Sequence, residues 1–123
     1  MRERLADPQT WCLVAEVGGA VVGHIGIFPG EMSRAPTGDP GVAHLWQLFV
    51  RPAHQGVGVA TALLHRGLAE TAARGFERIR LFTPALQARA RHFYEREGFT
   101  APARPFDDQA LGLAVVEYWR DLP

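Results

Sequence analysis

Apolar and β-branched residues cluster in several short segments of the chain, and glycine or proline separates one segment from the next. That pattern predicts β-strands joined by turns. Thr10–Val17 and Ala20–Phe28 are separated only by Gly18 and Gly19, which predicts a tight β-hairpin. Val42–Val50 is more uniformly apolar, as is typical of a strand buried near the middle of a sheet.

Two other segments repeat their apolar residues with the period of an amphipathic helix. The first runs from Gly56 to Arg74, and Gly75 is its stop signal. Its apolar face consists of Ala60, Leu63, Leu64, Gly67, Leu68 and Thr71. The second predicted helix is Gln87–Phe99, which Gly98 closes.

Two more strands, Arg78–Thr83 and Leu111–Trp119, are predicted, and Pro29–Gly41 and Ala101–Ala110 are predicted to be loops. A strand, a helix and a strand in succession return to one sheet through a right-handed crossover, which requires a parallel pair. We therefore expect a single domain over residues 1–123 of the α/β (α+β) class. Its sheet should be mixed and mostly antiparallel, with helices on both faces.

The composition excludes several classes of protein. The 13 basic and 13 acidic residues balance, so nothing indicates binding to nucleic acid or to an anionic membrane. Cys12 is the sole cysteine, which excludes an intrachain disulfide and favours a reducing, cytoplasmic location. The start of the chain lacks the apolar run of a signal peptide, and no apolar stretch approaches the ~20 residues of a membrane span. The five histidines show no known ligand spacing, so no metal is expected.

Gly56 and Gly58 stand at the start of the first predicted helix. Glycine has a low helix propensity, so two glycines at this place are unexpected unless they serve another purpose. A helix N-terminus presents unpaired N–H groups and the positive end of the helix dipole, and it binds phosphate. Without Cβ atoms, the glycines let phosphate oxygens approach the backbone. A tight turn before a helix is the alternative. The segment lacks the G-K-[ST] ending of a Walker loop and the third spaced glycine of the dinucleotide fingerprint.

A second feature follows in the same region. Gln55, Gly58 and Ala60 form a Q-x-x-G-x-A motif after the strand that ends in LFV, and the segment ARHFYEREGF follows one helix and one strand later. In this order, the two motifs resemble those of the GNAT family of N-acetyltransferases, over about Thr10 to Trp119. The resemblance implies an acyl-CoA N-acyltransferase-like fold with acetyl-CoA as the cofactor. It also implies acetyl transfer to an amine by direct attack in a ternary complex.

The resemblance further implies which residues hold the cofactor. Leu48, Phe49 and Val50 would lie along the pantetheine, on a strand that carries a bulge and splays from the next strand. The pyrophosphate would be surrounded by Gln55, Gly56, Val57, Gly58, Val59, Ala60 and Thr61. Many relatives have arginine at the position of Gln55 and asparagine at the position of Gln87, so this chain departs from the family at both contacts.

Tyr94 stands where the family often has the acid that protonates the departing thiolate, a role that suits a phenol with a reference pKa of ~10. Packing in the core is the alternative. His44 stands at the strand position where some relatives have a glutamate as the general base. It could accept the proton directly or through water, because imidazole titrates near neutrality. It is equally compatible with a structural histidine. Other relatives use a glutamate where this chain has Phe82. Trp46 and Gln47 are expected to line the acceptor pocket.

Members of the family usually begin with a strand and two helices, whereas this chain has only nine residues before Thr10. We therefore expect those elements to be absent and Thr10–Val17 to be an exposed, apolar edge strand. Either the natural protein starts upstream of Met1 or a second subunit covers that edge, and a homodimer is expected. The acceptor would be a small-molecule or peptide amine, held partly by the Pro29–Gly41 and Ala101–Ala110 loops.

Two alternatives to the transferase remain open at this point. A non-catalytic acyl-CoA-binding or regulatory module is favoured by the short N-terminal segment, by Gln87 and by the missing glutamate. Metal-dependent enzymes of the glyoxalase and bleomycin-resistance type also contain segments similar to FYE…GF. Their fold repeats a βαβββ unit, and the sequence shows no such repeat.

Overall fold

The computed structural model describes residues 2–7 and 10–123 of the chain. Most of the strands and both α-helices coincide with predicted segments. The strands are β1 (Arg2–Asp7), β2 (Thr10–Val17), β3 (Ala20–Pro29), β4 (Val42–Val50), β5 (Arg78–Pro84), β6 (Phe106–Asp108) and β7 (Leu113–Asp121). The helices are α1 (Val59–Ala73) and α2 (Ala88–Arg96), and the short 3₁₀ turns are η1 (Gly30–Met32) and η2 (Pro52–His54).

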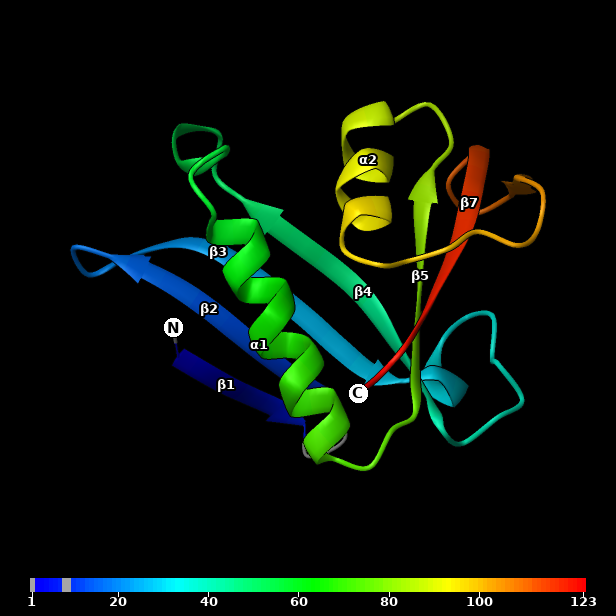
Figure 1. Cartoon of the computed structure of the whole chain (residues 1–123), viewed down its shortest axis with the longest axis horizontal. Helices are drawn as coiled ribbons and strands as arrows, with labels where there is room; N and C mark the ends of the chain where they lie inside the picture. Colours follow the sequence, from blue (N-terminus) through cyan, green and yellow to red (C-terminus); the bar gives the residue numbers. More distant parts are fainter. Residues whose placement is uncertain (1, 8–9) are drawn as a thin grey trace.

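The strands form one seven-stranded sheet in the order β1-β2-β3-β4-β5-β7-β6. Neighbouring strands are antiparallel except for β4 and β5, which α1 connects (Figure 1). The predicted mixed, mostly antiparallel sheet with a parallel pair across a strand–helix–strand unit is therefore confirmed. Gly18 and Gly19 form the predicted hairpin turn, with φ values of 58° and 83°. Within residues 2–7 and 10–123, neither helix combines the length and the apolar character that crossing a membrane requires.

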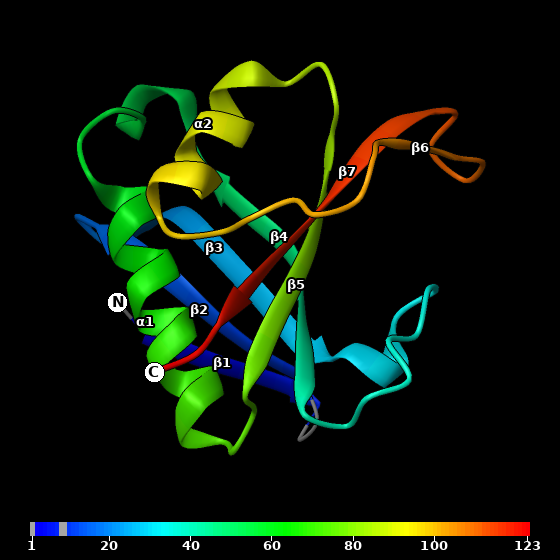
Figure 2. The same cartoon turned by 45° about the vertical axis from the view of Figure 1, so that its right-hand side comes forward.

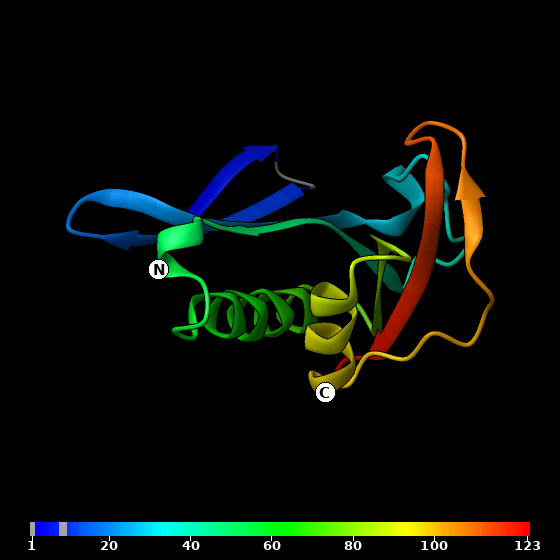
Figure 3. The same ribbon diagram turned by 90° about the horizontal axis from the view of Figure 1, so that it is seen from above.

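Both α-helices lie on the same face of the sheet, which we call the helix-covered face (Figure 3). The main core fills the space between them and the strands: Leu63 and Leu64 of α1 are 0% exposed, and Tyr94 of α2 belongs to the same cluster. Gly67 lets α1 approach closely, because a Cβ there would lie 2.9 Å from Ile25 Cδ1. In this respect the structure differs from the expected arrangement with helices on both faces. An apolar stripe shows that a helix packs on a sheet, but it does not show on which side.

The opposite face carries no α-helix among the described residues, and we call it the helix-free face. Ring contacts, a hydrogen bond and an ion pair link its side chains across the sheet. The linked residues are Phe28 of β3, His44 of β4, Arg80 and Phe82 of β5, and Glu117 of β7. Along β5 and β7 they alternate with Ile79, Leu81 and Tyr118, which belong to the core beneath the helices.

The start of the chain contains a strand that the sequence pattern did not predict. β1 pairs antiparallel with β2, and Arg2 lies opposite Val14. The expectations that the N-terminal strand is missing and that Thr10–Val17 is an exposed edge are therefore wrong, because β1 occupies the edge. Several charged residues in β1 hide the strand signal, as is common for edge strands. The reason for expecting a second subunit over β2 no longer holds.

β6 is a short strand within a segment that was predicted to be a loop, Ala101–Ala110. Its three residues pair with the start of β7, from Leu113 to Val115. Two of the three are aspartates, so no apolar alternation marks the strand in the sequence. An ion pair of 2.9 Å between Arg34 Nη2 and Asp108 Oδ2 joins this hairpin to the loop that follows β3. The two loops expected at the acceptor pocket are thus in contact.

Candidate functional site

β4 and β5 run side by side only over their first halves. Val42–Leu45 pairs with Arg78–Leu81, and the two strands then diverge (Figure 2). At the same place, the register of β4 against β3 shifts between Gly26 and Ile27, which leaves Trp46 as an extra residue. Gly26 makes room for its ring, because a Cβ there would lie 2.5 Å from the indole. This β-bulge bends β4 and ends the regular pairing, as the resemblance implied.

A cleft of about 880 Å³ lies where the two strands diverge. Ligand pockets in proteins span ~300–1,000 Å³, so the cleft is large enough for a nucleotide-sized cofactor. Its walls come from β4, from the loop before α1, from the first turn of α1 and from α2. The predicted residues that line it are Leu48, Phe49, Val50, Gln55, Gly56, Gly58, Ala60, Thr61, Gln87 and Tyr94. Val57 and Val59 are not among its lining residues, and the side chain of Val57 is 70% exposed.

The loop before α1 presents main-chain N–H groups that have no partner. Gly56 and Gly58 have φ values of 79° and 89°, a left-handed conformation that turns the chain into the helix. In the part of the chain that the structure describes, no amide from residue 56 to residue 61 donates a hydrogen bond. A Cβ at either glycine would meet no atom within 4 Å, so both face open space. The turn can therefore accept an anion at the positive end of the α1 dipole.

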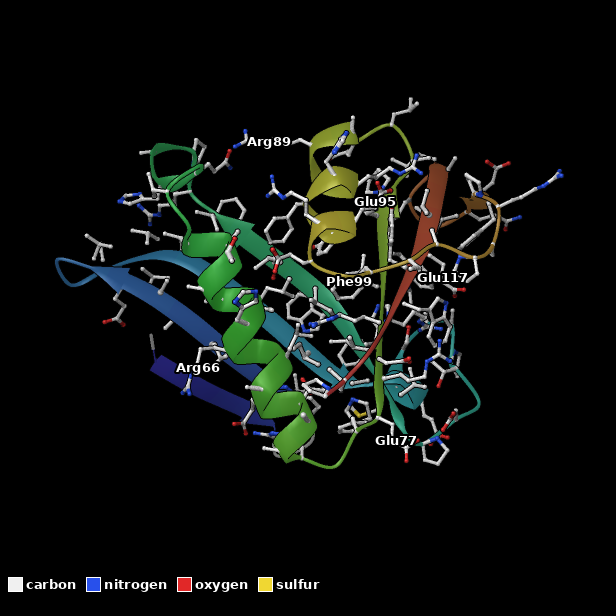
Figure 4. The ribbon with its side chains drawn as sticks, viewed as in Figure 1. Arg66, Glu77, Arg89, Glu95, Phe99 and Glu117 are labelled. Carbon is white, nitrogen blue, oxygen red and sulfur yellow. The ribbon has the colours of Figure 1, made fainter. Side chains whose placement is uncertain are left out.

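α2 brings basic side chains to the other side of the cleft. Arg89, His92 and Arg96 line it, and their i, i+3, i+7 spacing places them on one side of the helix. Arg89 extends toward the loop before α1 (Figure 4), and its Nη1 lies 3.4 Å from Gln55 Oε1. Gln55 Nε2 donates to the carbonyl of Val50 at 2.9 Å, so the Gln55 side chain is bound to β4. The three residues on α2 were not predicted from the sequence, although their helical spacing was a visible signal.

Tyr94 lies on the wall of the cleft and is 8% exposed. Its ring centroid is 5.3 Å from that of Phe93 and 5.5 Å from that of Phe99, so core packing and a place at the cleft are not exclusive. Burial raises the pKa of Tyr94 to about 12. The phenol is therefore protonated at neutral pH, and it is a weaker acid than the reference pKa of ~10 suggested. With this pKa, it donates a hydrogen bond to a thiolate more readily than it donates a proton.

A polar network around Tyr118 holds α2 against the sheet. The Tyr118 hydroxyl donates to Glu95 Oε2 at 2.7 Å and accepts from Arg91 Nε at 3.0 Å. Arg91 also donates from Nη1 to the carbonyl of Ala85 at 3.1 Å. Glu95 lies on the side of α2 that faces β5 (Figure 4). These contacts fix α2, and with it the basic side chains of the cleft, relative to the strands.

His44 lies on the helix-free face, and it does not line the cleft. It is 6% exposed and packs between Phe28 and Phe82, with centroid distances of 5.5 and 5.2 Å. Arg80 Nε donates a hydrogen bond to His44 Nδ1 at 3.2 Å. Burial, followed by the charges of Arg80 and Arg34, lowers the pKa of His44 to about 4. The expected titration near neutrality, which was the reason for a base role, therefore does not hold, and the Nδ1 lone pair is occupied.

Trp46 and Gln47 do not line the cleft either. Trp46 is 47% exposed, and its ring lies 5.8 Å from that of His24. A place in the acceptor pocket thus stays a prediction for both residues. Gln87 is the N-cap of α2 and makes no side-chain capping bond. Within residues 2–7 and 10–123, no three or more His, Cys, Asp or Glu side chains are grouped so that they could hold a metal ion.

The chain is similar to several known proteins. The sequence profile of the acetyltransferase (GNAT) family matches residues 1–99. A mycothiol acetyltransferase of Cellulomonas flavigena is 38% identical over 95 residues, which are 74% of this chain and 27% of that protein. An uncharacterized N-acetyltransferase of Mycobacterium tuberculosis is 33% identical over 97 residues, which are 79% of this chain and 57% of that protein. The chain thus spans about a quarter to somewhat over half of these curated relatives.

Solved structures are similar over most of the chain. The crystal structure of a nourseothricin acetyltransferase has a TM-score of 0.78 at 23% identity, over 94% of this chain and 67% of that one. The PaiA N-acetyltransferase of Thermoplasma acidophilum, solved in complex with coenzyme A, has a TM-score of 0.68 at 18% identity. The match covers 89% of this chain and 60% of that one. At these identities, the likeness shows that the fold is shared.

Proposed function

Because the chain belongs to the acetyltransferase (GNAT) family, we propose that it transfers the acetyl group of acetyl-CoA to an amine. The observation that carries the proposal is the row of unpartnered amides at residues 56–61, beside a cleft of about 880 Å³. A diphosphate supplies the acceptor oxygens that an uncapped helix N-terminus lacks. The amides therefore suit the pyrophosphate of coenzyme A.

The rest of the cleft fits the remaining parts of the cofactor. Beyond the bulge, β4 is unpaired on its β5 side, so the backbone at Leu48 and Val50 can pair with pantetheine amides as an added strand would. Arg89 places a positive charge at the loop, where the amide of Gln55 has none. When it is bound, acetyl-CoA supplies an acyl group activated as a thioester.

Direct attack by the amine fits this chain better than a relay through a cysteine. Cys12 lies on β2 and does not line the cleft, and burial raises the pKa of its thiol, which disfavours the reactive thiolate. Tyr94 lines the wall of the cleft, which supports its proposed role as hydrogen-bond donor to the sulfur that leaves. We propose that the amine enters on the helix-free face, beside Trp46 and Gln47.

Gly58 and Gly75 offer a matched test of the cofactor site. They lie at opposite ends of α1 with φ values of 89° and 93°, and a Cβ at either would meet no atom within 4 Å. Alanine at either position should therefore cost a similar amount of stability, about 1 kcal/mol. Only Gly58→Ala adds a methyl group beside the free amides, so it alone should weaken acetyl-CoA binding, by about tenfold or more in a calorimetric titration.

An equal affinity for acetyl-CoA in the Gly58→Ala and Gly75→Ala variants would contradict binding at this loop. Transfer itself is tested by thiol release from acetyl-CoA with a panel of polyamines, aminoglycosides, amino acids and peptides. Saturable binding of acetyl-CoA without release of thiol for any of these amines would favour the non-catalytic acyl-CoA-binding module instead.

A further inference from the structure

The helix-free face places a carboxylate where β4 and β5 begin to separate. The last paired residues of the two strands are Leu45 and Leu81, and the next residue of β5 is Phe82. Glu117 of β7 lies directly opposite Phe82 in the antiparallel register. Its side chain is 25% exposed, so it is within reach of solvent and of a ligand. Figure 4 shows Glu117 beside β5, on the strand that follows it in the sheet.

Glu117 can act on an amine only if the amine arrives on the same side of the sheet; this step rests on the proposed function. The cleft opens between the start of α1 and α2, so a cofactor in it occupies the helix-covered side of the divergence. Beyond its wall, that side is filled by the core around Tyr94 and Phe99. On the helix-free face, the rings of Trp46 and Phe106 are 47% and 42% exposed. An amine therefore reaches the thioester from the face that carries Glu117.

Glu117 and Tyr118 are consecutive residues of β7, so their side chains point to opposite faces of the sheet. Tyr118, the residue after Glu117, points to the helix-covered face, and its ring centroid lies 6.2 Å from that of Tyr94. Glu117 therefore lies at the same level of the sheet as Tyr94, but on the other side. This is the arrangement that a direct transfer needs, with one group near the attacking nitrogen and the other near the departing sulfur.

His44 is the other titratable side chain of this region, but its geometry does not suit proton removal. Its Nδ1 accepts the hydrogen bond from Arg80 Nε, so in the neutral ring the remaining nitrogen carries the proton and is a donor. The same contact turns Arg80 toward β7, where its Nη1 lies 3.9 Å from Glu117 Oε2. His44 thus acts as a positioning residue for the guanidinium.

In the part of the chain that the structure describes, one oxygen of the Glu117 carboxylate accepts no hydrogen bond. Oε1 accepts a hydrogen bond of 2.9 Å from Trp119 Nε1, and Oε2 faces Arg80 beyond hydrogen-bond distance. Several charged groups of the neighbouring elements are paired with one another. Arg78 of β5 lies over the Trp119 ring and pairs with Asp121, and Asp108 of β6 pairs with Arg34 of the loop after β3.

We propose that Glu117 is the general base that removes a proton from the ammonium group of the acceptor, which frees the nitrogen lone pair for attack. Of the three protons on that nitrogen, the carboxylate of Glu117 takes one and later returns it to water. The nitrogen lone pair then forms the bond to the acyl carbon, and the carbon–sulfur bond breaks with its electron pair left on sulfur. The second proton passes from the nitrogen through water to the departing sulfur, which becomes the thiol of coenzyme A, while Tyr94 donates a hydrogen bond to that sulfur. The third proton stays on the amide, so charge and atoms balance.

The test compares Glu117→Gln with Glu77→Gln, an exposed carboxylate in the turn before β5 (Figure 4). Glutamine at 117 keeps the oxygen that accepts from Trp119 Nε1 but cannot take a proton. Thiol release is measured from acetyl-CoA with the best amine of the panel, between about pH 6 and pH 10. At neutral pH, Glu117→Gln should lower kcat/KM about 100-fold, with unchanged acetyl-CoA affinity and an unchanged Glu77→Gln control.

The pH profile separates a base from a structural residue. The deficit of Glu117→Gln should shrink as the pH rises toward the ~10 of a free amine, because the deprotonated amine needs no base. A deficit that is the same at every pH, or full activity at neutral pH, would overturn this inference and leave the proposed function intact. Failure of the wild-type chain to acetylate any amine would overturn both.

Discussion

The two faces of the sheet bury different kinds of side chain. On the helix-covered face, Leu63, Leu64 and Ile79 are all 0% exposed and pack as hydrocarbon. On the helix-free face, the buried residues include His44 and Arg80, at 6% and 3% exposed. Burying hydrocarbon stabilises a fold, whereas burying an imidazole and a guanidinium destabilises it unless their polar atoms are paired.

The difference indicates that the helix-covered face contributes most to stability, whereas the helix-free face carries the polar groups that suit a reaction site. The pairing on the helix-free face is incomplete, because Arg80 Nη2 has no hydrogen-bond partner in the part of the chain that the structure describes. Hydrocarbon at the same positions would be the more stable choice. A polar cluster beside the divergence of β4 and β5 therefore agrees with the proposed place of the amine, and variants on each face can test the contrast.

The largest effect is expected in the core of the helix-covered face. Leu64 is 0% exposed, and Leu64→Ala removes buried methyl groups and leaves a cavity. It should lower the free energy of unfolding by about 4 kcal/mol in a chemical denaturation experiment. On the helix-free face, Trp46→Ala removes a larger ring that is 47% exposed and should cost only about 1 kcal/mol. Similar losses for the two variants would remove the distinction between the faces.

A smaller effect on stability is expected from His44 on the helix-free face, and it comes from a buried polar group instead of buried hydrocarbon. Its pKa is lowered to about 4 by burial and by Arg80 and Arg34, whereas in the unfolded chain it is near ~6.5. The unfolded state therefore binds a proton that the folded state does not, so stability falls as the pH drops from about 6.5 toward about 4. The full difference corresponds to about 3 kcal/mol.

His44→Gln isolates this contribution, because glutamine keeps an acceptor oxygen for Arg80 Nε but does not titrate. Denaturation curves at several pH values should show a shallower loss of stability in acid for the variant. Burial also lowers the pKa of His24, so a weaker acid dependence should persist. If wild type and variant lost stability in parallel between about pH 6.5 and pH 4, the buried imidazole would not be the cause.

The sequence predicted well what local pattern determines. The glycines at 56 and 58 signalled the turn into α1, and the structure gives them φ values of 79° and 89°. The strand–helix–strand order predicted the parallel pair of β4 and β5. The side of the sheet on which α2 packs follows instead from contacts such as Tyr118 with Glu95, which lie 23 residues apart.

The polar cluster of the helix-free face could not be predicted from local sequence patterns either, because its contacts also join residues far apart in the chain. Arg80 meets His44 only because β4 and β5 pair in one particular register, and the two residues are 36 positions apart. Glu117 meets Phe82 through the register of β5 and β7. A shift of one residue would turn each side chain to the other face, so register decides the environment, and with it the pKa, of His44.

A smaller effect than those of Leu64 and His44 is expected at the rim of the cleft, where the charge comes from an exposed side chain. Arg89 Nη1 lies 3.4 Å from Gln55 Oε1, and Arg89 lines the cleft. An exposed cation beside a phosphate contributes modestly and is screened by salt. Arg89→Ala should weaken acetyl-CoA binding about tenfold, or about 1.4 kcal/mol, and reduce its salt dependence. Arg66→Ala, which removes an exposed arginine of α1 outside the cleft, should leave the affinity unchanged (Figure 4).

A second substitution makes the role of Arg89 specific. If Arg89 supplies the charge that Gln55 lacks, Gln55→Arg added to Arg89→Ala should restore most of the affinity, because the guanidinium then comes from the loop instead of α2. Calorimetric titration of acetyl-CoA at low and at high salt measures both changes. Equal dissociation constants for wild type, Arg89→Ala and Arg66→Ala at low salt would show that the amides of the α1 turn hold the cofactor without help from α2. In that case the helix-covered side of the cleft would bind through its backbone alone, and charged side chains would contribute only on the helix-free face.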